Sequence, residues 1–280
     1  MTLTKDSQPL TIVRPSSGWH TVDVAELWRY RELLFFLVWR DFKVRYKQTV
    51  LGAGWAILKP VLSMVIFSII FGRLAGIPTD GMPAPVFYFA GLLPWILFHD
   101  GVAKASSSLV TGRSLVTKVY FPRATVPLAS VLAGLVDFGL AAIVMAGLMV
   151  FFSVPIGPAL WAAPFFVLLT VLTGFGVGLW LSALNVSYRD IGYVTPFALQ
   201  AWLYASPVAY SATLIPEGVG QAIYALNPMA GVIQGFRWAV LGSGQPAPEL
   251  LAISLLVAAA LLVSGSVYFY RVERSFADVI

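Results

Sequence analysis

The chain of 280 residues is strongly apolar: 59% of its residues are hydrophobic, only 11% are charged, and the mean hydropathy is +0.83. An ordinary soluble domain is about half apolar and about a quarter charged, so this composition excludes a single soluble globule, a disordered chain and a coiled coil. The net charge of +5 is modest, and in a membrane chain its placement matters more than its sum, so we expect no nucleic-acid partner. Cysteine is absent and histidine occurs twice, so we expect no disulfide and no metal site.

Long apolar runs predict six transmembrane helices, because a bilayer core about 30 Å thick needs roughly 20 apolar residues per helix. In chain order the predicted spans are residues 54–77, 86–110, 126–152, 160–184, 193–210 and 250–270. The fifth run is short and contains Pro196 and Pro207, and the mixed stretch 211–248 after it is typical of half-inserted helices. The predicted fold is an all-α polytopic membrane protein with short re-entrant helices between spans five and six.

The charge pattern predicts how the chain sits in the membrane. Lysine and arginine concentrate before the first predicted span, in the segments after the second and fourth spans, and in the tail. Cytoplasmic segments carry an excess of these residues, so we expect both termini to be cytoplasmic. The predicted regions are a cytoplasmic N-terminus at 1–53, a six-span domain at 54–270 and a cytoplasmic tail at 271–280. The first residues lack the pattern of a cleavable signal peptide.

Residues 23–47 predict an amphipathic helix at the membrane interface. Their apolar residues recur at steps of three and four: Val24, Leu27, Trp28, Leu34, Phe35, Val38, Phe42 and Tyr46. Arg40, Asp41 and Arg45 belong to this predicted interface helix. Two interpretations explain this pattern equally well and stay open. The helix is either a simple anchor attracted to anionic lipid or a docking helix for a partner protein.

Four ionisable residues, Lys59, Asp100, Lys104 and Asp137, lie inside the apolar runs. Each costs about 2.5 to 3.5 kcal/mol at a helix centre, so each is expected to face protein or water. Asp100 and Lys104 stand four residues apart and can pair on one helix face. Lys59 could pair with Asp137 at a similar depth, but its place near the start of a span favours snorkelling. Asp137 is the stronger candidate for an interior polar contact.

No residue is predicted to be catalytic. The chain contains no GxxxxGK[ST] phosphate cradle, no GxGxxG motif after a strand, no HExxH motif and no GxSxG motif. A membrane-embedded enzyme needs acids or histidines grouped at one depth, and the nearest grouping is His99, Asp100 and Lys104. Within this grouping, Asp100 and Lys104 are interpreted as a structural or gating pair near a helix end.

An aromatic and polar stripe marks the fifth predicted span. Tyr193, Phe197, Gln200 and Tyr204 follow one another at steps of four, three and four. Lining a pore, such a stripe offers flat apolar faces to sugar rings and hydrogen bonds to their hydroxyl groups. Packing between helices explains the same spacing, and both interpretations stay open.

Several segments together resemble one family, the permease subunits of type 2 class ABC exporters, in the branch that exports lipopolysaccharide O-antigen, capsule and teichoic acid chains. In chain order the matching segments are RDFKVRYKQTVLGAGWAILKP (40–60), GLLPWILF (91–98), LVTKVYFPRATVPLA (115–129), NVSYRDIGYV (185–194), SPVAY (206–210), NPMAGVIQGFRW (227–238) and ERSFADVI (273–280).

The resemblance implies a six-span subunit of the bacterial inner membrane that works as a homodimer with two copies of a separate ATPase subunit. That partner would bind ATP and Mg, so no cofactor is expected in this chain, and the cargo would be a lipid-linked polysaccharide. The resemblance also implies that the interface helix and two cytoplasmic loops contact the ATPase. The loop residues that match are Arg113, Phe121, Pro122, Arg123, Tyr188, Arg189 and Asp190. Phe121 and Pro122 are expected to form a stiff apolar knob, surrounded by charge-assisted contacts.

Three other functions stay open. A drug or small-lipid exporter of the same class would have a lateral gate lined by apolar residues instead of an aromatic and polar pore. A proton-coupled carrier would depend on Asp100 and Asp137 and would transport without ATP. A membrane-embedded transferase would depend on the grouping around His99.

Overall fold

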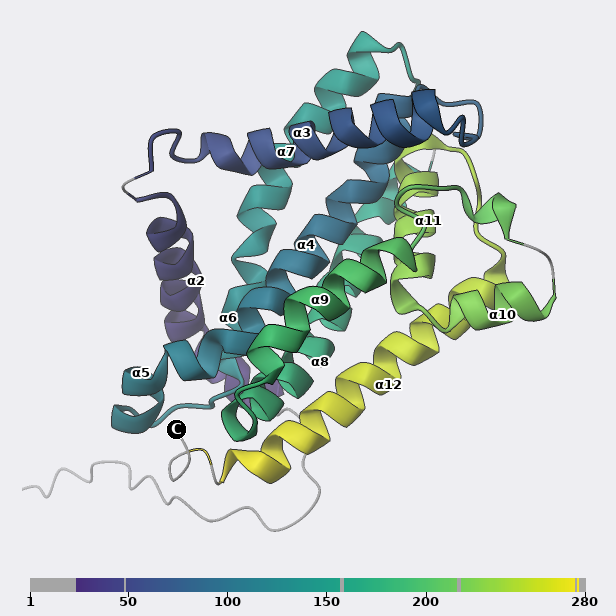
Figure 1. The fold of residues 1–280 in the computed structure, drawn as a ribbon. Coiled ribbons are helices and arrows are strands. Elements are labelled where there is room, and N and C mark those ends of the chain that lie inside the picture. The colour runs from purple at the N-terminus through teal and green to yellow at the C-terminus, as the bar shows by residue number, and fades with distance from the viewer. Residues whose placement is uncertain (1–23, 48, 157–158, 216–217, 275, 277–280) are drawn as a thin grey trace, which may run out of the picture.

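The computed structural model describes residues 24–47, 49–156, 159–215, 218–274 and 276, and within these ranges every regular element is a helix (Figure 1). The helices are α1 (Val24–Arg29), α2 (Arg31–Tyr46), α3 (Gly54–Phe67), the π-helical η1 (Ser68–Leu74), α4 (Ala84–Thr111), α5 (Arg113–Lys118), α6 (Thr125–Leu132), α7 (Gly134–Phe151), the 3₁₀ turn η2 (Leu160–Ala162), α8 (Ala163–Ser187), α9 (Ile191–Tyr204), the 3₁₀ turn η3 (Ala212–Leu214), α10 (Val219–Ala225), α11 (Pro228–Leu241) and α12 (Pro248–Glu273).

Among the described residues, five helical segments are long and apolar enough to cross a membrane. They are Gly54–Leu74, Ala84–Thr111, Thr125–Phe151, Leu160–Ser187 and Pro248–Glu273. These segments correspond to predicted spans one, two, three, four and six, with ends that differ by a few residues. The long apolar runs therefore predicted these five elements correctly.

The fifth predicted span is shorter than expected. Helix α9 ends at Tyr204 after 14 residues, which makes it roughly 21 Å long at 1.5 Å per residue, less than a bilayer core. Pro207 has no backbone N–H and disfavours helical conformation in the residue before it, so the helix stops before the proline. The apolar run to residue 210 continues as turns.

One asparagine fixes the point where α9 ends. The Asn227 amide donates hydrogen bonds to the Ala205 carbonyl (3.0 Å) and the Ser206 hydroxyl (2.9 Å) after α9. Its side-chain oxygen accepts hydrogen bonds from the Trp202 indole N–H (2.8 Å) and from the Met229 backbone N–H (3.0 Å), which caps α11. The end of α9 is therefore joined directly to the start of α11.

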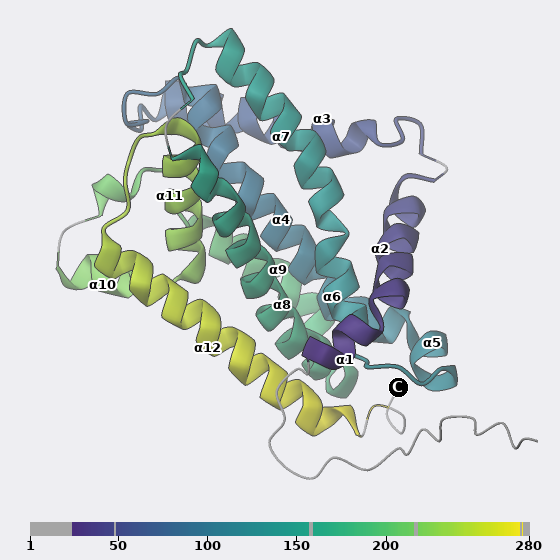
Figure 2. The ribbon, with the colours of Figure 1, turned by 180° about the vertical axis from the view of Figure 1, so that it is seen from behind.

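The bundle is built around α4 and α8, which pack along each other and are the most buried of the long helices. Helix α12 packs on the far side of α8, where the Gly176 carbonyl lies against Gly265 (Figure 2). Few residues of α3 and α12 are buried, and both helices have exposed apolar residues on the outside of the bundle. In a membrane, that exposed apolar surface faces lipid or another membrane helix.

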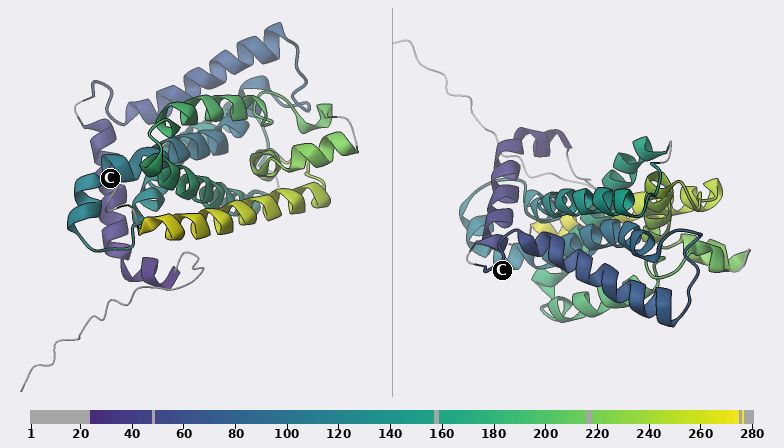
Figure 3. Two further views of the ribbon diagram at one scale, coloured as in Figure 1. Left: turned by 60° about the horizontal axis from the view of Figure 1, so that its bottom comes forward. Right: turned by 90° about the horizontal axis from the view of Figure 1, so that it is seen from above.

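The N-terminal helix is broken in two, whereas a single helix over 23–47 was predicted. Helix α1 ends at Arg29 and α2 begins at Arg31, while residues 1–23 lie outside the described part of the chain. Helix α2 runs across the direction of α12 in both views of Figure 3. Its most buried residue is Leu37, which the predicted stripe omitted, whereas Phe35 is 71% exposed. The apolar surface of α2 is therefore divided between the bundle and its surroundings.

A second apolar core lies at the end of the bundle that carries α2. Its buried members come from α2, α4, α5, α6, α8, α12, the segment before α6 and the segment after α12, and they include Leu37, Val116, Phe121, Leu179, Phe269 and Phe276. Figures 1 and 2 show α5, the α8–α9 turn and the C-terminal end of α12 gathered at this end. The two predicted cytoplasmic loops therefore lie at one end of the molecule.

Candidate functional site

A pocket of about 530 Å³ opens between α2, α3, α4 and α7, and it contains most of the charges that lie inside the bundle. Arg45 and Tyr46 come from the end of α2, Lys59 from α3, Asp100 from α4 and Asp137 from α7. Four helices thus place two cations and two carboxylates around one pocket.

Asp137 connects α2 to α7. One carboxylate oxygen pairs with the Arg45 guanidinium, and the other accepts a hydrogen bond from the Tyr46 hydroxyl (2.6 Å). Both charged side chains are less than one-fifth exposed. Burial raises the pKa of Tyr46, so the phenol stays protonated and remains a donor. Asp137 therefore makes a polar contact inside the molecule, and its partners are on α2.

Asp100 connects α3 to α4. Its two oxygens each accept a hydrogen bond from the Lys59 ammonium group (2.8 Å), and one of them also contacts the His99 ring (2.8 Å). The predicted pair of Asp100 with Lys104 does not form: Asp100 pairs with Lys59 and His99, and the Lys104 ammonium group makes no ion pair or hydrogen bond within the described residues. The possible pair of Lys59 with Asp137 does not form either, because the approach of α3 to α4 gives Lys59 a nearer carboxylate.

The Arg40 and Asp41 side chains pair with each other on α2, with nitrogen-to-oxygen distances of 2.8 and 3.0 Å. They are sequence neighbours and partly exposed, so this ion pair ties no two elements together. Exposed pairs of this kind contribute about 0 to 1 kcal/mol. Of the three residues assigned to the interface helix, only Arg45 reaches another helix.

The first predicted loop, residues 112–123, contains the short helix α5 and presents a different apolar surface from the one expected. Phe121 and Pro122 are buried in the second core, whereas Tyr120 is 71% exposed and Val119 is 51% exposed. Phe121 therefore forms part of the fold in this structure, and the exposed apolar ring beside it is Tyr120.

The charged residues of this loop differ in what they contact. Arg123 donates a hydrogen bond to the backbone carbonyl of Glu273 at the end of α12, and its guanidinium lies over the Phe276 ring. Cations near a helix C-terminus stabilise the carbonyls that lack partners there. Arg113 is exposed at the start of α5. The loop is thus anchored to α12 through Arg123, while α5 itself is accessible.

The second predicted loop is the turn between α8 and α9. Tyr188, Arg189 and Asp190 are all exposed there. Just before the turn, the Asn185 amide donates a hydrogen bond to the Ser106 carbonyl of α4 (2.8 Å). The turn is therefore held on a rigid base and presents its polar side chains outward.

The stripe on α9 faces away from the bundle. Tyr193 is 84% exposed, Phe197 77% and Tyr204 61%, and Gln200 is also exposed and lies 3.3 Å from the Tyr204 hydroxyl. The opposite face of α9 packs inward through Leu199 and Thr195. Packing within this chain therefore does not explain the stripe.

Sequence reasoning missed the role of Arg237, which lies in the mixed stretch 211–248. Arg237 lies in α11 and is 3% exposed. Its guanidinium sits 3.8 Å from the centre of the Phe87 ring and donates to the carbonyls of Pro207 (3.0 Å) and Val208 (3.4 Å). A side chain at Gly91 would collide with the guanidinium. The only signal in the sequence was a lone charge within the apolar run of α11.

Removing the Tyr46 hydroxyl should loosen α2 measurably. A hydrogen bond to a charged group contributes about 1.5 to 3 kcal/mol, so the Tyr46→Phe variant is expected to melt at a lower temperature in detergent. Tyr30→Phe is the control, because the Tyr30 hydroxyl makes no hydrogen bond in the part of the chain that the structure describes, and its melting temperature should stay unchanged. Equal melting temperatures for the two variants would contradict a stabilising contact at Asp137.

Comparison with known proteins shows the relationship of this chain. Residues 32–241 match the family described as ABC-2 type transporter. The chain is 32% identical over 263 residues to the O-antigen export system permease protein RfbA of Myxococcus xanthus, covering 92% of this chain and 98% of that protein. It is 27% identical over 250 residues to the protein of the same name from Klebsiella pneumoniae, covering 89% of this chain and 95% of that protein.

A relative with a less specific name is the inner membrane transport permease YadH of Escherichia coli, which is 29% identical over 226 residues, covering 77% of this chain and 84% of that protein. The family match includes α2, the charged pocket, both loops and α11, so the features described above lie within it. The chain therefore belongs to the ABC-2 type transporter family, and its role is that of a multi-pass membrane permease.

Proposed function

We propose that this chain is the membrane-spanning permease subunit of an ATP-driven exporter that moves a lipid-linked, O-antigen-like polysaccharide across the bacterial inner membrane. The observation that carries the proposal is the similarity to O-antigen export permeases along nearly the whole chain. The five apolar helices long enough to span a membrane are what such a subunit needs.

The energy source in this proposal is a separate ABC ATPase, present in two copies, which binds ATP and Mg. The sequence contains no phosphate-binding motif of its own, and ABC-2 permeases work with ABC ATPases. The end of the molecule with α2, α5 and the α8–α9 turn is the proposed docking surface. There Arg113, Tyr188, Arg189 and Asp190 are accessible, as a partner requires.

The proposed topology has six crossings, with the short α9 as the fifth and both termini in the cytoplasm. Helix α9 is proposed to cross together with the turns that continue its apolar run to residue 210. Helices α10 and α11 contain 7 and 14 residues and lie in the mixed stretch between α9 and the last span, so they are proposed as the re-entrant pair. The lysines and arginines near α2 and α5 support the proposal that this end of the molecule is on the cytoplasmic side. Residues 1–53, 54–270 and 271–280 keep their predicted roles as the N-terminal region, the six-span domain and the tail.

The proposed assembly is a homodimer in which the α9 stripe faces the path of the polysaccharide. Tyr193, Phe197, Gln200 and Tyr204 support this, because their side chains are exposed and face no other part of the bundle. The exposed apolar surface of α3 offers the second copy a membrane-compatible contact. ATP binding would bring the ATPase subunits together, and their contacts with the two loops would move the attached spans and open the path.

The docking surface can be tested at Tyr120. Phe121→Asp would place a charge in the second core and disturb folding, so it cannot separate docking from stability. Tyr120→Asp changes an exposed ring and is expected to abolish co-purification of the ATPase in mild detergent while the chain stays monodisperse. Tyr120→Phe keeps the ring and should retain the ATPase. Full retention of the ATPase by Tyr120→Asp would contradict docking at this loop.

The cargo is tested by removing the gene from its native cell. Export of a lipid-linked polysaccharide predicts that surface polysaccharide disappears and that lipid-linked polymer accumulates on the inner side. Complementation with the wild-type chain should reverse both effects. Unchanged surface polysaccharide, with the ATPase still co-purifying, would favour the drug or small-lipid exporter, and transport without ATP would favour the proton-coupled carrier.

A further inference from the structure

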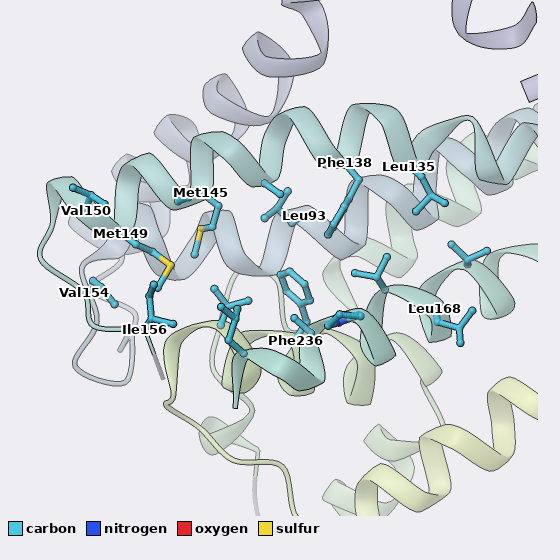
Figure 4. Close-up of a pocket in the computed structure, with 18 of the residues that line it drawn as sticks. Leu93, Leu135, Phe138, Met145, Met149, Val150, Val154, Ile156, Leu168 and Phe236 are labelled. Carbon is cyan, nitrogen blue, oxygen red and sulfur yellow. The ribbon is translucent and has the colours of Figure 1, made fainter. Parts of the chain in front are cut away.

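A long groove runs between α7 and α8, on a part of the molecule that the proposed function does not use. Its volume is about 660 Å³, and Figure 4 shows side chains from α7, α8, α4 and α11 pointing into it. The floor is formed by buried residues, among them Met145, Phe236 and Val240, whose exposed fractions are 3%, 4% and 5%. The mouth is formed by exposed residues such as Val150 and Leu168. The groove thus leads from the outer surface into the bundle.

The groove exists because two consecutive helices are held apart. Helix α7 packs on α3 and α4, whereas α8 packs on α4 and α12, so α4 forms the base between them. Consecutive elements are usually neighbours in space. Here Val154 and Ile156, in the connection from α7 to α8, line the groove, and the facing sides of α7 and α8 do not pack on each other.

The chemistry of the lining selects hydrocarbon. The lining residues are alanine, valine, leucine, isoleucine, proline, phenylalanine and methionine, so no side chain in the groove is charged or carries a hydrogen-bonding hydroxyl, amide or carboxyl group. Its walls belong to the segments Thr125–Phe151 and Leu160–Ser187, which are long enough to cross the membrane, so the groove lies at the depth of the acyl chains. An empty groove would lose the dispersion contacts of its lining atoms.

The groove is long. From Leu135 to Val150 it follows α7 for roughly 22 Å. Met145 and Met149 are flexible side chains that adapt to an irregular hydrocarbon ligand. The groove is thus extended and lined only by apolar side chains, as a single extended hydrocarbon chain requires.

We propose that this groove is a binding site for one acyl chain of a bilayer phospholipid, which fills the space between α7 and α8. The groove recognises the hydrocarbon tail alone, because the cations that could bind a phosphate, Arg45 and Lys59, line a different pocket between α2 and α3. The exported substrate, with its large polar head, is therefore not the occupant. The phospholipid acts as a structural ligand that keeps α7 at a fixed distance from α8.

The proposal is tested with a phospholipid that carries a photoreactive diazirine in its acyl chain. The full-length chain is reconstituted with this lipid in vesicles, irradiated, and the labelled positions are identified by mass spectrometry. A chain inside the groove should label Met145 and Phe236, which a lipid on the outer surface cannot reach. Labelling confined to exposed residues such as Ile143 and Leu256, which are each 70% exposed, would overturn the proposal.

A pair of substitutions on α7 supplies the matched control. Ala146 lines the groove, whereas Ile143 lies on the same helix outside it. Ala146→Trp fills the groove and is expected to reduce labelling of Phe236 to background, while Ile143→Trp should leave it unchanged. Equal labelling in the two variants would overturn the proposal, as would crosslinks between the α7 helices of two copies. Should Ala146→Trp not fold, Ala163→Phe fills the groove from α8 and tests the same expectation.

Discussion

An Asp137→Leu variant is expected to lose export and to melt at a clearly lower temperature than the wild type. Asp137 is the residue on α7 that holds both Arg45 and Tyr46 of α2. Its removal leaves a largely buried guanidinium without a carboxylate, a change that costs up to about 3 to 5 kcal/mol. The end of α2 would then separate from α7, and a movement of α2 would no longer be transmitted to α7. Melting in detergent and complementation of export measure the two effects.

Two variants show whether the lost charge pair is the cause. The double variant Arg45→Met with Asp137→Leu removes both charges and should recover much of the thermal stability that Asp137→Leu loses. Asp41→Leu removes a carboxylate that pairs only within α2, so its cost should stay below about 1 kcal/mol. If Asp41→Leu destabilised the protein as much as Asp137→Leu does, the contact between α2 and α7 would not be the important one.

A Gly176→Val variant is expected to yield no correctly packed protein. A Cβ atom at position 176 would lie 2.7 Å from the backbone of Leu262 on α12, so the two helices would have to move apart. Small residues allow this close approach, which supplies much of the packing between membrane helices. The monodisperse fraction in size-exclusion chromatography measures the effect.

Gly147→Val is the matched control for this prediction. Gly147 lies in α7, and a Cβ atom there would have no heavy atom within 4 Å. The control variant should therefore be recovered as wild type. Similar recovery of both variants would mean that α8 and α12 tolerate separation and that their contact does not determine the fold.

The apolar runs were enough to predict most of the membrane helices, because the length of a span is fixed by the bilayer and needs no tertiary information. The exception was α9, where hydropathy extended the helix to residue 210. Pro207 stops the helix, and the turn after Tyr204 is held by Asn227, which lies more than 20 residues further along the chain. No local pattern contains that interaction.

The charged pocket was only partly predictable for the same reason. The sequence identified Lys59, Asp100 and Asp137 as unusual, since charges in apolar runs are costly wherever they lie. It could not supply their partners, because spacing reports only neighbours on one helix, as in the expected pair of Asp100 with Lys104. The observed partners come from other helices: Tyr46 and Asp137 are 91 residues apart, and Lys59 and Asp100 are 41 apart.

Loop residues were assigned by chemistry and not by exposure. Phe121 and Tyr120 are adjacent aromatic residues, and the sequence offered no means of deciding which one faces the core. The structure places Phe121 inside, in the cluster that also contains Leu37 of α2 and Phe269 of α12, and Tyr120 outside. An experiment on this loop designed from sequence alone would therefore have tested folding.

The Asn227 side chain has a hydrogen-bonding capacity that is completely used. An amide group offers two N–H donors and one oxygen that accepts two bonds, and all four are engaged, with Ala205 and Ser206 as acceptors and Trp202 and Met229 as donors. Aspartate would lack the two donors, and glutamine would be one methylene too long. Helix α9 and the start of α11 are consequently fastened as one rigid body. Any rotation of α9 during a transport cycle would turn α11 with it, so the two helices would move together.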